Sequence, residues 1–167
     1  SPDGRRLAFA RQLDGVYVIN VDGSGLRRIW SRGTTSYPSY PVDWSPDGSK
    51  IAFMDCCGTD TGIFVIDSNG SDVTRLIGHE FAGPGCKDVF DTCGVYSPTW
   101  SPDGQQIAFA YWGGYCCGSS GVAIINVDGT LPRFLLPTDG GSSPAWSPDG
   151  TKIAFQTYSR EIGLVNA

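Results

Sequence analysis

The sequence WSPDGSKIAF at residues 44–53 decides the fold, because it returns along the chain in nearly unchanged form. Its core, S-P-D-G followed by two residues and Ile/Leu-Ala-Phe, occurs at residues 1–9, 45–53, 101–109 and 147–155. A tryptophan precedes three of the copies, at Trp44, Trp100 and Trp146. Four copies at this spacing identify an internal repeat that fills the chain.

Each part of the repeat has a predicted structural role. In S-P-D-G, Pro fixes φ at the first central turn position, Asp suits the second, and Gly takes the left-handed conformation that returns the chain. The turn therefore joins a strand that ends at Trp to a strand that contains Ala-Phe. A third, aliphatic strand is predicted at residues 16–21, 63–67, 122–127 and 162–165. A second tight turn and a short outer strand follow, the latter at residues 26–30, 73–77 and 132–136.

Four short strands in a repeat of about 44–56 residues predict an all-β fold, a β-propeller with one four-stranded antiparallel blade per repeat. We expect blades at residues 1–37, 38–95, 96–141 and 142–167. The first blade lacks its innermost strand and the last lacks its outermost strand, so the two ends do not complement each other. Because open strand edges favour association, we expect a segment of a larger propeller of about six to eight blades. In the alternative, neighbouring chains complete the sheets in a ring or filament.

The repeat also resembles a known family. The unit P-x-W-S-P-D-G-x-K-I-A-F, followed by an aliphatic strand, D-G-S and a short Arg-containing strand, is similar to the repeat of TolB-like, WD-type propellers. The resemblance covers nearly the whole chain and implies the fold, while function is carried by sites rather than by folds. Similar repeats occur in periplasmic transport accessories, in peptidase propeller domains and in secreted proteins.

Charge and cysteine content restrict the partners and the compartment. The net charge is −5 and no basic stripe is visible, which argues against nucleic acid as a partner. The apolar runs are too short for membrane insertion. Six cysteines in so small a chain indicate an oxidising compartment, so we expect an extracellular or periplasmic protein with disulfides and no cofactor.

All six cysteines are predicted to lie on one face of the propeller. Strands alternate in direction within a blade, so the S-P-D-G and D-G-S turns share one face and the remaining loops share the other. The cysteines fall in three of those remaining loops: Cys56 and Cys57, Cys86 and Cys93, and Cys116 and Cys117. Bridges from Cys56 or Cys57 to Cys86 or Cys93, and a local Cys86–Cys93 bridge, stay open as pairings. A zinc site with His79 is a weaker alternative, because no C-x-x-C spacing occurs.

The same loops carry the predicted binding surface. Five aromatic residues lie in or beside them: Phe81, Phe90, Tyr111, Trp112 and Tyr115. Such rings stack on sugars or bury against proteins, which favours a non-catalytic scaffold that binds a protein or glycan partner. Alternatively, the rings cover the disulfides. Two other hypotheses are a self-assembling structural protein, whose partners are copies of itself, and an accessory domain of a larger enzyme such as a peptidase.

Other motifs are assigned mainly to turns. Asp67, Asn69 and Asp72 have calcium-like spacing but coincide with a predicted turn. Asn69-Gly70-Ser71 fits the N-glycosylation sequon. The acids of the repeat, Asp3, Asp47, Asp103 and Asp149, recur with the structural period and are predicted to be turn residues. No catalytic constellation is predicted, since His79 has no evident nucleophile partner.

Overall fold

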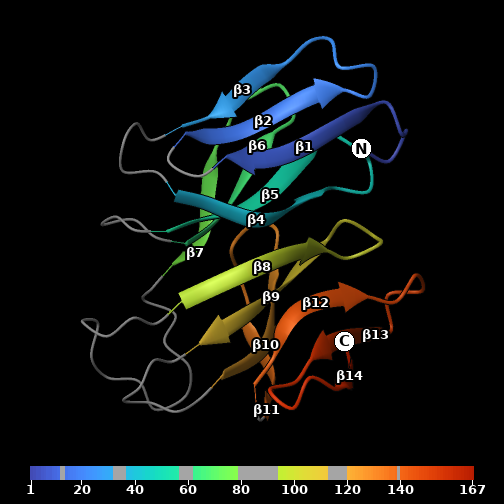
Figure 1. Cartoon of the computed structure of the whole chain (residues 1–167). Coiled ribbons are helices and arrows are strands. Elements are labelled where there is room, and N and C mark those ends of the chain that lie inside the picture. Colours follow the sequence, from blue (N-terminus) through green and yellow to red (C-terminus); the bar gives the residue numbers. More distant parts are fainter. Residues whose placement is uncertain (12–13, 32–36, 57–61, 79–93, 113–119, 139) are drawn as a thin grey trace.

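The computed structural model describes residues 1–11, 14–31, 37–56, 62–78, 94–112, 120–138 and 140–167. These ranges contain fourteen strands in four antiparallel sheets and no helix. The sheets lie side by side in chain order, from the N-terminal sheet at the top of Figure 1 to the C-terminal sheet at the bottom. The all-β prediction and the blade arrangement are therefore confirmed. Within the described residues, no helix could cross a membrane.

The blades contain three, four, four and three strands, in the predicted order. Blade 1 consists of β1 (Arg6–Arg11), β2 (Gly15–Asn20) and β3 (Arg27–Trp30). Blade 2 consists of β4 (Tyr37–Trp44), β5 (Lys50–Cys56), β6 (Gly62–Asp67) and β7 (Thr74–Gly78). Blade 3 consists of β8 (Gly94–Trp100), β9 (Gln106–Trp112), β10 (Ser120–Asn126) and β11 (Arg133–Thr138). Blade 4 consists of β12 (Ser142–Trp146), β13 (Lys152–Gln156) and β14 (Ile162–Asn166).

Two strands begin earlier than the sequence pattern indicates. Tyr37 pairs with Cys56 in the sheet of blade 2, and Gly94 pairs with Trp112 in the sheet of blade 3. Both residues were predicted to close the preceding blade. The difference arises because backbone pairing with β5 and β9 continues to Tyr37 and Gly94, and strand ends are less sharply defined by the sequence pattern than strand centres.

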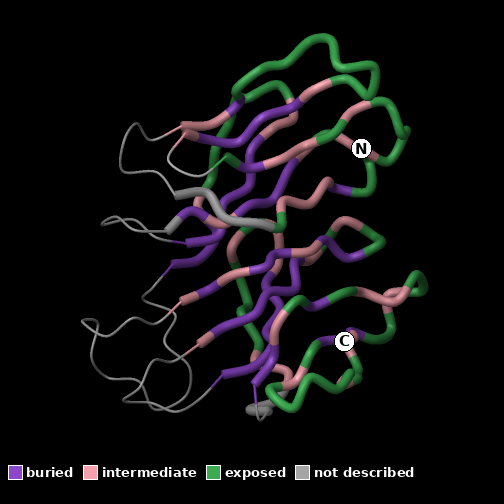
Figure 2. Tube along the Cα trace, viewed as in Figure 1, coloured by how far each residue is buried: buried purple, intermediate pink, exposed green. Residues whose placement is uncertain are grey.

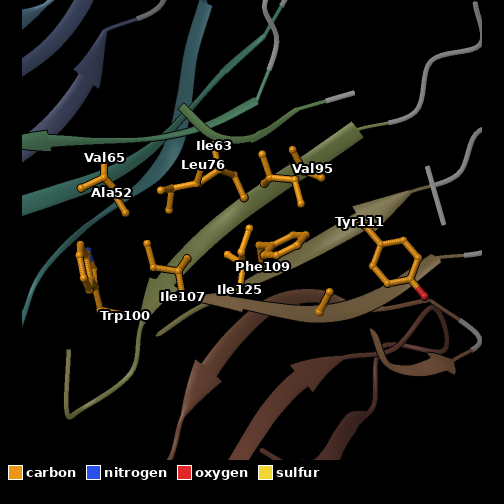
Figure 3. Packing of buried hydrophobic residues seen from close by; sticks show 12 residues of the cluster. Ala52, Ile63, Val65, Leu76, Val95, Trp100, Ile107, Phe109, Tyr111 and Ile125 are labelled. Carbon is orange, nitrogen blue, oxygen red and sulfur yellow. The ribbon is translucent and has the colours of Figure 1, made fainter. Parts of the chain in front are cut away.

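The blades pack face to face with a fixed polarity, which means that the same strand positions face the preceding blade in each repeat. In the Ile-Ala-Phe strand of blade 2, Ile51 and Phe53 pack against Val16 and Val18 of blade 1. Ala52, on the opposite side of the same strand, packs against blade 3. Figure 3 shows this second interface, with side chains of blades 2 and 3 interleaved in one layer. Successive residues of a strand point to opposite faces, so one short motif supplies both interfaces of a blade.

Burial at the two outer blades follows the same polarity. Leu7 of blade 1 is 55% exposed, whereas its counterparts Ile51, Ile107 and Ile153 are each 0% exposed. On blade 4, Ile162 is 81% exposed and Leu164 is 66% exposed. Figure 2 shows that buried residues concentrate between the blades and that exposed ones dominate the C-terminal blade. The outer faces of blades 1 and 4 are therefore the uncovered equivalents of interfaces that are buried inside the stack.

Candidate functional site

The S-P-D-G turns form a regular polar row on one face of the molecule, on the right in Figure 1. In blade 2, Asp47 Oδ1 accepts hydrogen bonds from Ser45 Oγ at 2.6 Å and from the backbone N–H of Ser49 at 2.9 Å. The backbone N–H of Gly48 donates to the Ser45 carbonyl at 2.9 Å, and Gly48 has a φ of 71°. Asp3, Asp103 and Asp149 repeat the carboxylate bonds in the other blades.

These bonds hold the turn carboxylates in their charged form. The Ser45 hydroxyl, followed by the Ser49 backbone N–H, lowers the pKa of Asp47 to about 2. The Ser147 hydroxyl is the first cause that lowers the pKa of Asp149 to about 2. The pKa values of Asp3 and Asp103 are lowered by the equivalent serine hydroxyls. Each hydrogen bond to the carboxylate stabilises the ionised state, so these acids act as fixed turn anchors.

The second set of turns places the residues of the calcium and glycosylation predictions. Asn69 occupies the position of Asp22 in blade 1, and its Oδ1 accepts the backbone N–H of Ser71 at 2.8 Å. Asp67 pairs with Lys50 at 2.5 Å, and the Ser71 hydroxyl lies 3.1 Å from Asp67 Oδ2, 2.7 Å from Asn69 Oδ1 and 3.4 Å from Asp72 Oδ2. No metal-type cluster occurs in the described residues. Asn69 is exposed, so its position on a surface turn agrees with the sequon prediction, which stays a prediction.

Two arginines lie in the groove between blades 1 and 2 on this face, and a pocket of about 150 Å³ remains beside Arg6. The guanidinium carbon of Arg6 lies 4.7 Å from the centre of the Trp44 ring. Arg27 crosses the blade boundary and donates to the Ser68 carbonyl at 3.0 Å and to the Asn69 carbonyl at 2.9 Å. This groove thus takes up one stacked guanidinium and one hydrogen-bonded guanidinium, both from blade 1.

The equivalent groove between blades 2 and 3 is open. Lys50, the counterpart of Arg6, is held by Asp67, and the counterpart of Arg27 is the short Thr74. A pocket of about 300 Å³ remains there. Asp47, Asp72 and Asp103 contribute carboxylates to its wall, together with Trp100. We call this space the interblade pocket.

The sequence analysis missed the interblade pocket. When the repeats are aligned on their turns, Arg27, Thr74 and Arg133 occupy one position. The small Thr74 is only a partial signal, because the groove between blades 3 and 4 holds a pocket of about 350 Å³ although Arg133 stands at this position. The direction taken by Lys50 has no sequence signal, because it depends on which of two neighbours the ammonium contacts.

The strand ends that flank the cysteine-bearing connections lie on the opposite face. Register pairs Asp55 with Gly62 at one end of blade 2, and Gly78 lies beside Gly62. In blade 3, Trp112 is paired with both Gly94 and Ser120. These strand ends lie together on the left in Figure 1. The anchor points of all three cysteine-bearing connections therefore share one face, opposite the tight turns.

Most residues predicted for that face lie outside the described residues. Cys56 ends β5, while Cys57, Cys86, Cys93, Cys116 and Cys117 fall in segments that the structure does not describe. His79, Phe81, Phe90 and Tyr115 also lie outside them. Trp112 is partly buried at the end of β9. Asp55, which the sequence analysis did not single out, is only 1% exposed beside Cys56.

Tyr111 requires a correction to the predicted binding surface. Its side chain is 1% exposed, and its ring centre lies 4.8 Å from that of Phe134 in an edge-on arrangement. Burial raises the pKa of the Tyr111 phenol. The ring belongs to the core between blades 2 and 3 (Figure 3), because strand alternation turns it inward.

Comparison with known proteins agrees with this architecture. No protein-family profile matches the chain. A putative TolB from Agrobacterium tumefaciens superimposes with a TM-score of 0.73, at 24% identity over 95% of this chain. The chain has a TolB-like β-propeller fold. TolB from Acinetobacter baumannii gives a TM-score of 0.68 at 17% identity over 99% of the chain, and a chain of a nidogen/laminin complex gives 0.69 at 12% over 98%.

The similar proteins are longer than this chain. It covers 52% of the Agrobacterium TolB-like chain and 41% of the Acinetobacter one. Among curated proteins, it is 28% identical over 116 residues to the uncharacterized peptidase YuxL of Bacillus subtilis. That match spans 64% of this chain and 16% of YuxL.

Proposed function

We propose that this TolB-like propeller is an extracytoplasmic scaffold that binds a protein or glycan partner through the face bearing its cysteine-rich connections. The observation that carries the proposal is the shared placement of the anchor points, Cys56 to Gly62, Gly78 to Gly94 and Trp112 to Ser120. Rigid blades that present irregular loops on one side are a common arrangement for recognition. The six cysteines support an oxidising compartment.

The turn chemistry supports a scaffold role for the other residues. All four serines of S-P-D-G donate to the aspartate two positions later, at 2.5–2.6 Å. A hydroxyl that donates to a turn carboxylate of lowered pKa is a poor nucleophile, because such a carboxylate is a weak base. These residues are therefore assigned to structure.

The match to YuxL favours a second candidate. The match covers 16% of YuxL, which is the size expected if this chain corresponds to a repeat segment within a longer peptidase. In this candidate the propeller is an accessory domain, and residues outside the present chain perform catalysis. Peptidase activity in the purified chain itself would contradict this assignment.

The uncovered outer faces indicate what surrounds the four blades. Leu7 lies on the side that packs against the preceding blade in every other repeat, and Ile162 and Leu164 lie on the side that packs against the following blade. We assign both faces to further blades of the same repeat. If copies of this chain cover these faces instead, light scattering of the complete protein that contains the chain will show oligomers. Their formation should then depend on Leu7.

Binding is tested by screening the oxidised chain against a glycan array and by cross-linking it to candidate extracellular proteins. We expect a ligand whose binding is lost after reduction, because five of the six cysteines lie in the connections and Cys56 is the residue from which one connection starts. Quantitative thiol labelling of the denatured, non-reduced chain should find no free cysteine. Several labelled cysteines, or the absence of any ligand, would count against the proposal.

A further inference from the structure

The groove between blades 1 and 2 is the structural equivalent of the interblade pocket, and the two can be compared directly. Both grooves lie between successive S-P-D-G turns, and both have a repeat tryptophan in the wall, Trp44 in one and Trp100 in the other. In the first groove, the guanidinium of Arg6 stacks on Trp44 at 4.7 Å. The molecule itself thus shows which chemical group this type of groove accommodates.

In the second groove both cationic positions are vacant because of two substitutions in the repeat. Lys50 turns away to Asp67, with its Nζ 2.5 Å from Asp67 Oδ1. Thr74 replaces the arginine that would reach the carbonyls of Val127 and Asp128, the counterparts of Ser68 and Asn69. The pocket of about 300 Å³ lies at the position that the two arginines occupy in the first groove, where a smaller pocket of about 150 Å³ lined by Arg6 remains.

The pocket wall is electrostatically suited to a cation. Asp47, Asp72 and Asp103 line it, and among the lining residues that the structure describes only Lys50, which is already paired, has a positive charge. The turn bonds of Asp103 use Oδ1, which leaves Oδ2 on the same carboxylate for a ligand. Carboxylates that flank an aromatic ring are a recurring arrangement for binding guanidinium and ammonium groups.

Trp100 supplies the aromatic wall of the pocket. The residue is 7% exposed and lines the pocket. Its indole N–H is buried without a hydrogen-bond partner in the described residues, and so is that of Trp44, whose ring Arg6 covers in the first groove. A guanidinium has no acceptor for this N–H, so the ring face is the part of Trp100 that a cation uses. Figure 3 shows Trp100 at one end of the packed layer, near Val65, which also lines the pocket.

We propose that the interblade pocket binds the guanidinium group of an arginine side chain presented by a polypeptide partner. Stacking on Trp100 would reproduce from outside what Arg6 does on Trp44, and Asp72 and Asp103 would add carboxylate partners for the guanidinium. A volume of about 300 Å³ is at the lower limit of small-ligand pockets, which suits one side chain rather than a cofactor. This site is on the opposite face from the cysteine-rich connections and is independent of the function proposed for them.

The test is a titration of the ¹⁵N-labelled chain, monitored at the Trp100 indole and the Gln105 amide by NMR. The probe is the peptide Ala-Ala-Arg-Ala-Ala-amide, and its citrulline analogue is the isosteric neutral control. We expect saturable shifts at both signals and about tenfold weaker binding of the citrulline peptide, the loss that removal of one charge-assisted contact produces. Equal binding of the two peptides, or no saturable shift, would overturn the proposal.

Two variants localise the binding. Asp72→Asn retains a residue that tolerates the observed φ of 49° and should weaken binding by about two- to fivefold, as for an exposed ion pair. Asp22→Asn makes the same charge change away from the pocket and should leave binding unchanged. Thr74→Arg should abolish the shifts while preserving spectral dispersion, since its guanidinium fills the groove as Arg27 does in the first one.

Two further arms distinguish the alternatives. Free L-arginine should bind more weakly than the peptide, and tighter binding of the free amino acid would assign the site to a small molecule and contradict a polypeptide partner. A chain whose residues 79–93 are replaced by a Gly-Ser linker should still bind the arginine peptide. If the arginine peptide still shifts the NMR signals of the Thr74→Arg variant, the peptide binds elsewhere.

Discussion

The carboxylate of Asp43 on β4 crosses from blade 2 to blade 3, where its Oδ2 accepts the backbone N–H of Trp100 at 2.8 Å. The same oxygen accepts a hydrogen bond from Thr99 Oγ1 at 3.0 Å. Asp43 therefore ties the inner strands of two blades together directly beside the interblade pocket. It links the stability of the stack to the position of Trp100.

Loss of this link should destabilise the fold. For Asp43→Ala we expect a decrease of about 1.5–3 kcal/mol in the free energy of unfolding, the range for hydrogen bonds to charged groups. Asp43→Asn retains an acceptor oxygen and should lose less. Urea denaturation measures both, and equal stability of Asp43→Ala and the wild type would show that the contact contributes nothing.

The polarity of the blades predicts opposite results for one substitution at two equivalent sites. Ala108 is 0% exposed between blades 3 and 4, so Ala108→Leu should overpack that interface and cost about 1–3 kcal/mol. Ala154 is the same position in blade 4, on the face that no blade covers. Ala154→Leu should change stability by less than about 0.5 kcal/mol. Thermal unfolding of the two variants checks this, and a similar loss in both would refute the assigned polarity.

Much of this architecture follows from the sequence because the repeat determines local structure and packing together. Pro46 and Gly48 specify the turn, and alternation in Ile51-Ala52-Phe53 specifies which side chains enter which interface. Strand starts such as Tyr37 and Gly94 were displaced, since register depends on the partner strand. The interblade pocket was not predictable, because it depends on the choice of Lys50 between Asp67 and the tryptophan ring. The inward position of Tyr111 was missed because nearness in sequence to a loop does not determine side-chain direction.

Acid should weaken the fold through the turn carboxylates. The pKa of Asp47 falls from its ordinary value of 3.8 to about 2 on folding. A group whose pKa is lowered by folding stabilises the native state above its unfolded pKa, and this contribution disappears as the pH falls from about 4 to about 2. We expect the unfolding temperature to fall across that window. Asp47→Asn should reduce the slope, and superimposable pH profiles for variant and wild type would contradict the assignment.

The state of the interblade pocket should depend on Asp67. Asp67→Ala removes the partner of Lys50, whereas an asparagine would keep one, because Lys152 Nζ of blade 4 donates to the equivalent Asn166 Oδ1 at 3.2 Å. The released ammonium should then cover Trp100, as Arg6 covers Trp44, and weaken the arginine peptide several-fold. Asp22→Ala controls for the charge change. Peptide binding that is unaltered or stronger in Asp67→Ala would show that the Lys50–Asp67 pair does not hold the pocket open.

The most direct test of the proposed function is the binding of an array-identified glycan or protein ligand to three forms of the oxidised chain: wild type, Thr74→Arg, and a form with residues 79–93 replaced by a Gly-Ser linker. We predict that the linker form retains the β-sheet circular dichroism spectrum but loses the ligand. Thr74→Arg, altered on the opposite face, should bind as the wild type does. Undiminished binding by the linker form, or loss only in Thr74→Arg, would contradict a partner site on the cysteine-rich face.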